Sequence, residues 1–211
     1  KFDGRPLFPE RLAYTVEYDL SPAEKELYDL VTQYVTEEFN RAERLGGKHR
    51  NSVGFALTIL QRRLASSPEA IYQSLRRRRA RLETKLAEAK NSVNGKIAYS
   101  DKWDVDAEDF DEDDYGTDEY EQMEDDVVDT ASTAATVAEL EAEIATLRTL
   151  ERKANDVRIS GEDRKWEELS HLLQDNTNMF GADGRREKLI IFTEHKDTLN
   201  YLTEKICSLL G

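Results

Sequence analysis

Arginine side chains cluster in one stretch of the chain, where they could bind phosphate groups. Residues 50–90 carry ten basic side chains and three acidic ones, a local net charge of +7. A planar guanidinium binds phosphate through paired hydrogen bonds, and neutralised phosphates release counterions whatever the base sequence. The cluster therefore predicts a sequence-independent contact with nucleic acid. The candidate residues are Arg62, Arg63, Arg76, Arg77, Arg78, Arg79 and Arg81.

Each part of this cluster also has a purely structural interpretation. The run from Arg76 to Arg81 could be a solvated helix face that pairs with carboxylates of a neighbouring segment. Arg62 and Arg63 could face a cleft, or they could cover the edge of a buried helix with their alkyl stems, which is the interpretation we favour.

The sequence that follows is strongly acidic. Residues 101–129 hold sixteen acidic side chains and one basic one, Lys102, a local net charge of −15. The run 104–115 lacks the glycine and the glutamate that a calcium loop requires at its sixth and twelfth positions. We therefore expect residues 91–133 to form a mostly irregular acidic insert that is solvated or shields the arginines.

A second candidate group consists of Thr193, His195 and Thr198. Residues 188–193 are predicted to form a short buried strand, and residues 196–210 an amphipathic helix. Ligands of open α/β sheets bind at the carboxyl ends of strands, and the free N–H groups of a helix N-terminus suit a phosphate. The alternative is that side chains here only cap the helix, because capping uses the same groups.

Apolar periodicity predicts a mainly α-helical chain. An alternating, strand-like stretch over residues 12–20 is followed by Ser21, Pro22 and Glu24, a pattern typical of a capping-box helix start. The apolar seams at 68–90 and 134–158 match in length, so we expect a protruding antiparallel hairpin with the acidic insert at its tip. Helices are expected at residues 22–45, 51–65, 68–90, 134–158, around 166–173, and at 196–210.

The predicted elements divide the chain into six regions. One strand and one helix at the C-terminal end cannot build the parallel sheet that they imply, so we expect the rest of that α/β domain to lie elsewhere. The regions are an extended lead-in (1–20), a helical insert (21–90), the acidic insert (91–133), returning helices (134–175), a linker (176–187) and a βα unit (188–211).

Three segments, in this order, resemble parts of the Swi/Snf-type ATPases, which are helicase-like DNA translocases of superfamily two. They are residues 5–11 with 20–28 (RPLFPER and LSPAEKELY), residues 57–68 (LTILQRRLASSP) and residues 188–199 (KLIIFTEHKDTL). The long acidic-tipped insert resembles that of the bacterial helicase-related branch. The resemblance implies a middle fragment, with the helical inserts between two RecA-like lobes and, at residues 188–199, motif IV of the second lobe with its DNA-phosphate contact.

The chain lacks the motifs that bind and hydrolyse ATP. It contains no G-x-x-x-x-G-K-[ST] loop and no D-E-x-H sequence. We expect no catalytic residue, metal ligand or cofactor in this chain and no ATPase activity by itself. ATP and Mg²⁺ would belong to the parent enzyme, whose partners would be DNA and the remaining helicase lobes.

The overall composition agrees with an intracellular protein. The single cysteine excludes a disulfide framework, and no apolar run approaches the ~20 residues of a membrane span. The sequence predicts a cytoplasmic protein that does not enter a membrane, and the resemblance to the helicase-related branch implies a bacterial one. The chain also begins without Met, which suggests a piece of a longer protein. The alternative function is a self-standing helical scaffold that binds a protein partner through the hairpin.

Overall fold

The described part of the chain is mainly α-helical, which confirms the predicted class. The computed structural model describes residues 13, 15–43, 47–91, 117–175, 180, 183–186 and 188–211. In these ranges the β-type pairing consists of one isolated bridge, between Phe180 and Arg186. The helices are α1 (Pro22–Ala42), α2 (Gly47–Ser66), α3 (Pro68–Asn91), α4 (Thr117–Thr130), α5 (Val137–Ser160), α6 (Arg164–Asp175) and α7 (Lys196–Leu210).

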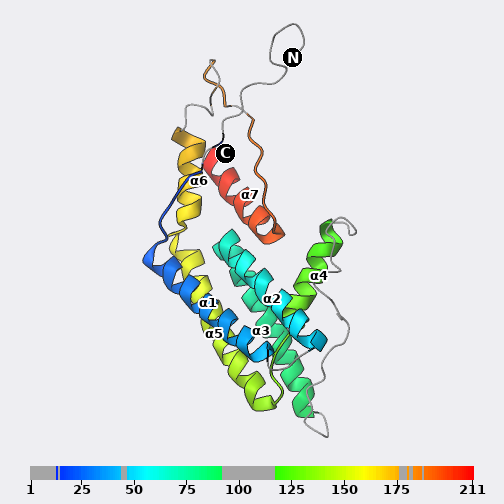
Figure 1. Ribbon diagram of the computed structural model, residues 1–211. Helices are drawn as coiled ribbons and strands as arrows, with labels where there is room; N and C mark the ends of the chain where they lie inside the picture. The colour runs from blue at the N-terminus through cyan, green and yellow to red at the C-terminus, as the bar shows by residue number, and fades with distance from the viewer. Residues whose placement is uncertain are drawn as a thin grey trace.

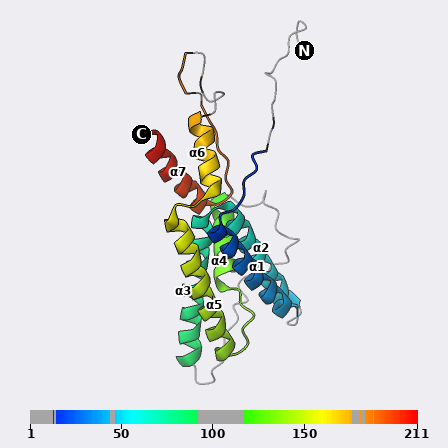
Figure 2. The same cartoon turned by 90° about the vertical axis from the view of Figure 1, so that its left-hand side faces the viewer.

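Helices α1 to α5 form a bundle. Figure 1 shows them side by side, with α6 and α7 beyond one end of the bundle, and Figure 2 shows the same arrangement after a turn of 90°. Helix α3 packs against α2, α4 and α5, and α1 packs against α2 and α5. Leucine, isoleucine and valine side chains from all five helices make one buried core. Helix α3 is therefore covered on several sides, and its arginines meet several different neighbours.

Side-chain caps begin α1 and α5, and the one at the start of α1 is the capping box that the sequence predicts. The Ser21 hydroxyl accepts a hydrogen bond from the Glu24 N–H, and the Glu24 carboxylate accepts one from the Ser21 N–H, at 3.2 and 2.7 Å. The same reciprocal pair joins Thr136 and Glu139 at the start of α5. At the end of α5, Gly161 has φ of 77°, a left-handed conformation that glycine adopts without steric cost.

Helices α3 and α5 run antiparallel along the seam that the sequence predicts. The seam residues Leu75 and Leu82 of α3 and Leu140 and Leu147 of α5 have no exposed surface. Four ion pairs join the two helices, and their residue numbers rise along α3 while they fall along α5, as antiparallel packing requires. The pairs join Glu69 to Arg158, Arg79 to Glu151, Glu83 to Arg148, and Lys90 to Glu141.

The prediction of a mostly irregular acidic insert is wrong for residues 117–130, which form α4. Its apolar residues Met123, Val127 and Val128 are at most 5% exposed and pack toward α2 and α3. These three apolar positions among many acidic ones were enough to bury one face of a helix, because the bundle supplies the other half of the contact. Residues 92–116, the rest of the predicted hairpin tip, lie outside the described residues.

The two strand-like segments are not paired in this structure. The described residues of 12–20 and residues 188–193 belong to no helix and no sheet. Ile190 is 74% exposed and Phe192 is 90% exposed, so the prediction that 188–193 is buried is wrong for this chain. The physical reason is that a strand is buried only when neighbouring strands and helices flank it, and the described chain offers none here.

Candidate nucleic-acid interface

The predicted arginines divide into three groups by exposure. The first group is fully buried, the second is partly buried and ion-paired, and the third is exposed. The fully buried arginines are Arg63 and Arg78. The partly buried, ion-paired ones are Arg62, Arg77 and Arg79, and the exposed ones are Arg76 and Arg81. Residues 76 to 81 occupy consecutive positions of α3, and each step turns the side chain by about 100°. The run therefore cannot present all its charges to one ligand.

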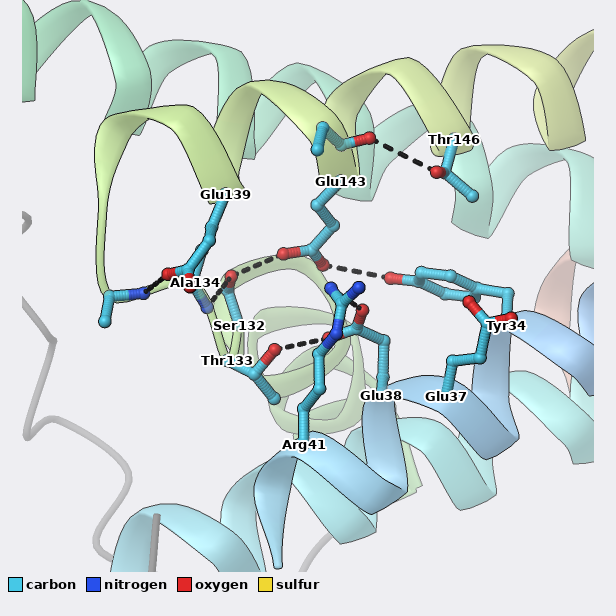
Figure 3. Close-up of polar contacts among 12 residues, drawn as sticks. Tyr34, Glu37, Glu38, Arg41, Ser132, Thr133, Ala134, Glu139, Glu143 and Thr146 are labelled. Atoms are coloured by element: carbon cyan, nitrogen blue, oxygen red, sulfur yellow. Dashed lines mark hydrogen bonds and ion pairs between the residues drawn. The ribbon is translucent and has the colours of Figure 1, made fainter. Parts of the chain in front are cut away.

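Arg78 is the centre of a buried polar network. Its Nε donates to the Tyr34 hydroxyl at 2.9 Å, its Nη2 to Glu143 at 2.8 Å, and its Nη1 to the Val128 carbonyl. Glu143 also accepts from the Tyr34 hydroxyl, at 3.0 Å, and from the Ser132 hydroxyl, at 2.5 Å, and dashed lines mark both hydrogen bonds in Figure 3. Burial raises the pKa of Tyr34 well above its ordinary value. Arg78 is 1% exposed, so its predicted contact with nucleic acid is wrong.

Arg63 is buried in the same way, on α2. Its Nη1 donates to the Ser74 hydroxyl at 2.9 Å, and its Nη2 pairs with Asp125 of α4 at 2.6 Å. With 1% of its surface exposed, it reaches no external phosphate, and the prediction for it is wrong. Its neighbour Arg62 pairs with Glu124, at 3.3 Å, and with Glu194. Charge pairing therefore places these two side chains, rather than the covering of a helix edge by alkyl stems.

Helices α4 and α7 bring carboxylates to three arginines at one place, which we call the arginine junction. Arg77 bridges the two helices, because its guanidinium lies 3.0 Å from Asp125 and 3.1 Å from Asp197. The buried apolar face of α4 holds its carboxylates there, so this part of the insert is an integral helix and not a solvated flap. The junction consists of Arg62, Arg63, Arg77, Glu124, Asp125, Glu194 and Asp197.

The start of α7 is closed by neighbouring helices. His195 is the N-cap residue but makes no side-chain cap, and the Lys196 N–H donates instead to Glu121 of α4 at 2.9 Å. The Thr198 hydroxyl shares hydrogen bonds with Ser66 and Ser67, at 2.7 and 2.8 Å. His195 and Thr198 are 3% and 4% exposed, so their predicted phosphate contact is wrong.

At this helix start no local side chain caps the helix, and two of the three candidate phosphate ligands, His195 and Thr198, are buried. The cap comes from a distant carboxylate rather than from a local side chain, and it occupies an N–H group that a phosphate would need. Thr193, in contrast, is partly exposed, and its predicted contact stays a prediction.

Beside the junction, two titratable side chains each have one buried atom with no hydrogen-bond partner among the described residues. The atoms are Oδ1 of Asp129 and Nε2 of His195. Burial raises the pKa of Asp129 to about 6, although Arg77 opposes the shift. Burial, together with the positive charges of the nearby Arg63 and Arg62, lowers the pKa of His195 to about 4. Both groups therefore favour the neutral form, and they make the junction sensitive to pH.

A second arginine-lined region lies between α3 and α5. It is a hollow of about 560 Å³, lined by Tyr72, Arg79, Arg148, Glu151, Arg152 and Asn155. The sequence analysis predicted Arg79 alone of these as a site residue. The spacing of Arg148 and Arg152, one helical turn apart, was the available signal. It becomes informative only once the antiparallel register places those residues opposite Arg79.

Within the described ranges, no three or more His, Cys, Asp or Glu side chains are grouped so that they could hold a metal ion. None of the helices described is both long and apolar enough to cross a membrane. Comparisons of the chain with protein-family models, with curated proteins and with solved structures found no match.

Proposed function

We propose that this chain is the helical inter-lobe part of an ATP-dependent DNA translocase or helicase of the Swi/Snf type. In this proposal the bundle contributes nucleic-acid contacts, and residues 188–211 begin the second RecA-like lobe. ATP and Mg²⁺ would bind to other parts of the parent enzyme, which would act in a bacterial cytoplasm. The observation that carries the proposal is the uncovered apolar surface of residues 188–211.

This surface extends over both parts of the predicted βα unit. Leu189, Ile190 and Phe192 are 44%, 74% and 90% exposed, and Leu199 of α7 is 51% exposed. A strand of a parallel sheet carries apolar residues on both faces because helices cover both faces. Exposed apolar side chains on the segment and on the helix after it are what an α/β unit shows when its neighbouring strands are missing. This pattern supports a lobe that is completed elsewhere.

The same unit is attached to the bundle by specific bonds. Asp197 accepts hydrogen bonds from Arg77 of α3, and Thr198 contacts Ser66 and Ser67 at the end of α2. These bonds fix the first turn of α7 against the bundle while its outer side stays open. An inter-lobe module needs both properties, because it must hold one lobe while leaving that lobe free to assemble.

DNA binding by the purified chain tests this proposal. Fluorescence anisotropy with a labelled duplex of about 20 base pairs should show binding at about 50 mM salt, and the affinity should fall linearly on a log–log plot of salt. Absence of binding at that salt would contradict the proposed nucleic-acid contact. It would favour the alternative, a helical scaffold whose exposed apolar surface binds a protein partner.

A further inference from the structure

We propose that the hollow between α3 and α5 binds successive phosphates of one DNA strand. This inference rests on the proposed function and deepens it, since it names the surface that meets the nucleic acid. The surface is not the one that the run from Arg76 to Arg81 suggests on its own. It combines one arginine of that run, Arg79, with Arg148 and Arg152 of α5.

Two of the three arginines of the hollow, Arg148 and Arg152, have charge available for a ligand. In the described part of the chain, Arg152 is exposed and has no carboxylate within ion-pair distance. The Arg148 side chain is 63% exposed, and among the described residues its one carboxylate partner is Glu83, at 2.7 Å. Arg76 lies one turn from Tyr72 on the same side of α3, and it is likewise exposed and unpaired among the described residues.

The local charge favours an anion even though the chain as a whole is acidic. The lining residues include three arginines and one glutamate, a net charge of +2, whereas the whole chain carries −14. Just outside the lining, Glu83 and Arg76 offset one another. At physiological salt the screening length is ~8 Å, so a bound phosphate is attracted mainly by these neighbouring arginines.

One arginine of the hollow is held in a fixed orientation. Glu151 and Glu83 both accept hydrogen bonds from Arg79, and Arg148 donates to the other oxygen of Glu83. Groups already fixed in place lose little conformational freedom when a ligand binds. Arg79 therefore serves as a rigid centre, flanked by the more mobile side chains of Arg148 and Arg152.

The length of the hollow suits a polyanion better than a single small ion. It extends from Tyr72 to Arg79 on α3 and from Arg148 to Asn155 on α5, about 10 Å along each helix axis. Successive phosphates of one DNA strand are about 3.4 Å apart along the duplex axis but roughly 6–7 Å apart along the strand itself, so about two phosphates fit within this length. The contacts involve no base edge, which predicts binding that does not depend on sequence.

Charge reversal at the two exposed arginines of α5 tests the inference. We expect R148E/R152E to raise the Kd for the labelled duplex by about tenfold or more, and to make the salt slope shallower by about 2. The matched control is R164E/R185E, which changes the charge equally at exposed positions outside the hollow. It should change the Kd by less than about twofold. A charge-retaining variant, R148K/R152K, should keep the slope of the wild type.

The outcomes separate this inference from the proposed function. If the wild type binds the duplex and both reversal variants weaken it equally, the hollow is not the contact surface and the inference is overturned. If R148E/R152E binds the duplex as tightly as the wild type does, the inference is likewise overturned. If the wild type itself does not bind, the proposed nucleic-acid contact fails together with the inference. A circular dichroism melt like that of the wild type would show that loss of binding is not loss of the fold.

Discussion

The arginine junction and the α3–α5 hollow both use arginines of α3. Carboxylates pair with the arginines of the junction, whereas part of the arginine charge at the hollow stays exposed. At the junction, α4 and α7 supply carboxylates to Arg77, which is partly buried between them. At the hollow, α5 adds further arginines beside Arg79. A run of arginines on a helix is distributed around its axis, so its total charge overstates what any one ligand meets. The neighbouring helices decide which charges remain available.

The largest effect should come from the buried network. We expect Arg78→Ala to destabilise the fold by about 3–5 kcal/mol, because Glu143 would keep a buried charge without its partner. The matched control is Arg76→Ala, two positions earlier on α3 and exposed, which should change stability by less than about 0.5 kcal/mol. Urea unfolding followed by circular dichroism measures both. Equal losses for the two variants would show that the network does not stabilise the bundle.

The next effect concerns Asp129 beside the junction. Its pKa is raised in the folded state, so the carboxyl gives up its proton more readily in the unfolded chain, and stability falls as pH rises from about 4 to 6. Asp129→Asn should therefore stabilise the protein by about 2 kcal/mol at pH 7 and change nothing below pH 4. A difference in unfolding free energy that stays constant across this range would contradict the assignment.

His195 should show the opposite dependence on pH. Its pKa is lowered in the folded state, so the unfolded chain takes up the proton first, and stability falls as pH drops from about 6.5 to 4. His195→Gln should remove about 1 kcal/mol of that loss. The measurement is the difference in melting temperature between variant and wild type at pH 7 and pH 4.5. We expect the variant to melt at a higher temperature than the wild type at pH 4.5 and at the same temperature at pH 7.

The last prediction is that the chain has no ATPase activity. Neither the junction nor the hollow contains a phosphate-binding loop, so the chain should release no phosphate from ATP, with or without DNA. The control is a Thr193→Ala variant prepared identically, and a phosphate-release assay compares the two. Hydrolysis by the wild type above that of the variant would contradict the proposal that this chain is part of a longer ATPase.

Local signals in the sequence were sufficient for most of the helices that the structure describes. Ser21 with Glu24 marked the start of α1, and the apolar seam of α3 predicted its buried side, because both patterns depend on residues within one or two turns. Helix α4 was missed because its few apolar residues acquire meaning only against α2 and α3. Burial of residues 188–193 was wrongly expected, because an apolar run shows that a segment is suited to burial, whereas burial itself requires neighbouring strands and helices.

The candidate site was harder to predict than the helices. Counting charges identified Arg76 to Arg81 but could not distinguish Arg78, whose partners Tyr34 and Glu143 are 44 and 65 positions away in sequence. It also missed Arg148 and Arg152, which join the hollow through the register of α5 on α3. Partners that are remote in sequence are set by the packing of whole helices, and no local pattern reports them.

The first turn of α7 is bonded to three helices of the bundle at once. Glu121 of α4 holds the Lys196 N–H, Arg77 of α3 holds Asp197, and Ser66 and Ser67 at the end of α2 hold Thr198. Such a joint has no single axis about which it turns freely. A torque applied to α7 is shared among α2, α3 and α4, so a domain carried on α7 can tilt only by moving the bundle with it or by breaking these bonds together.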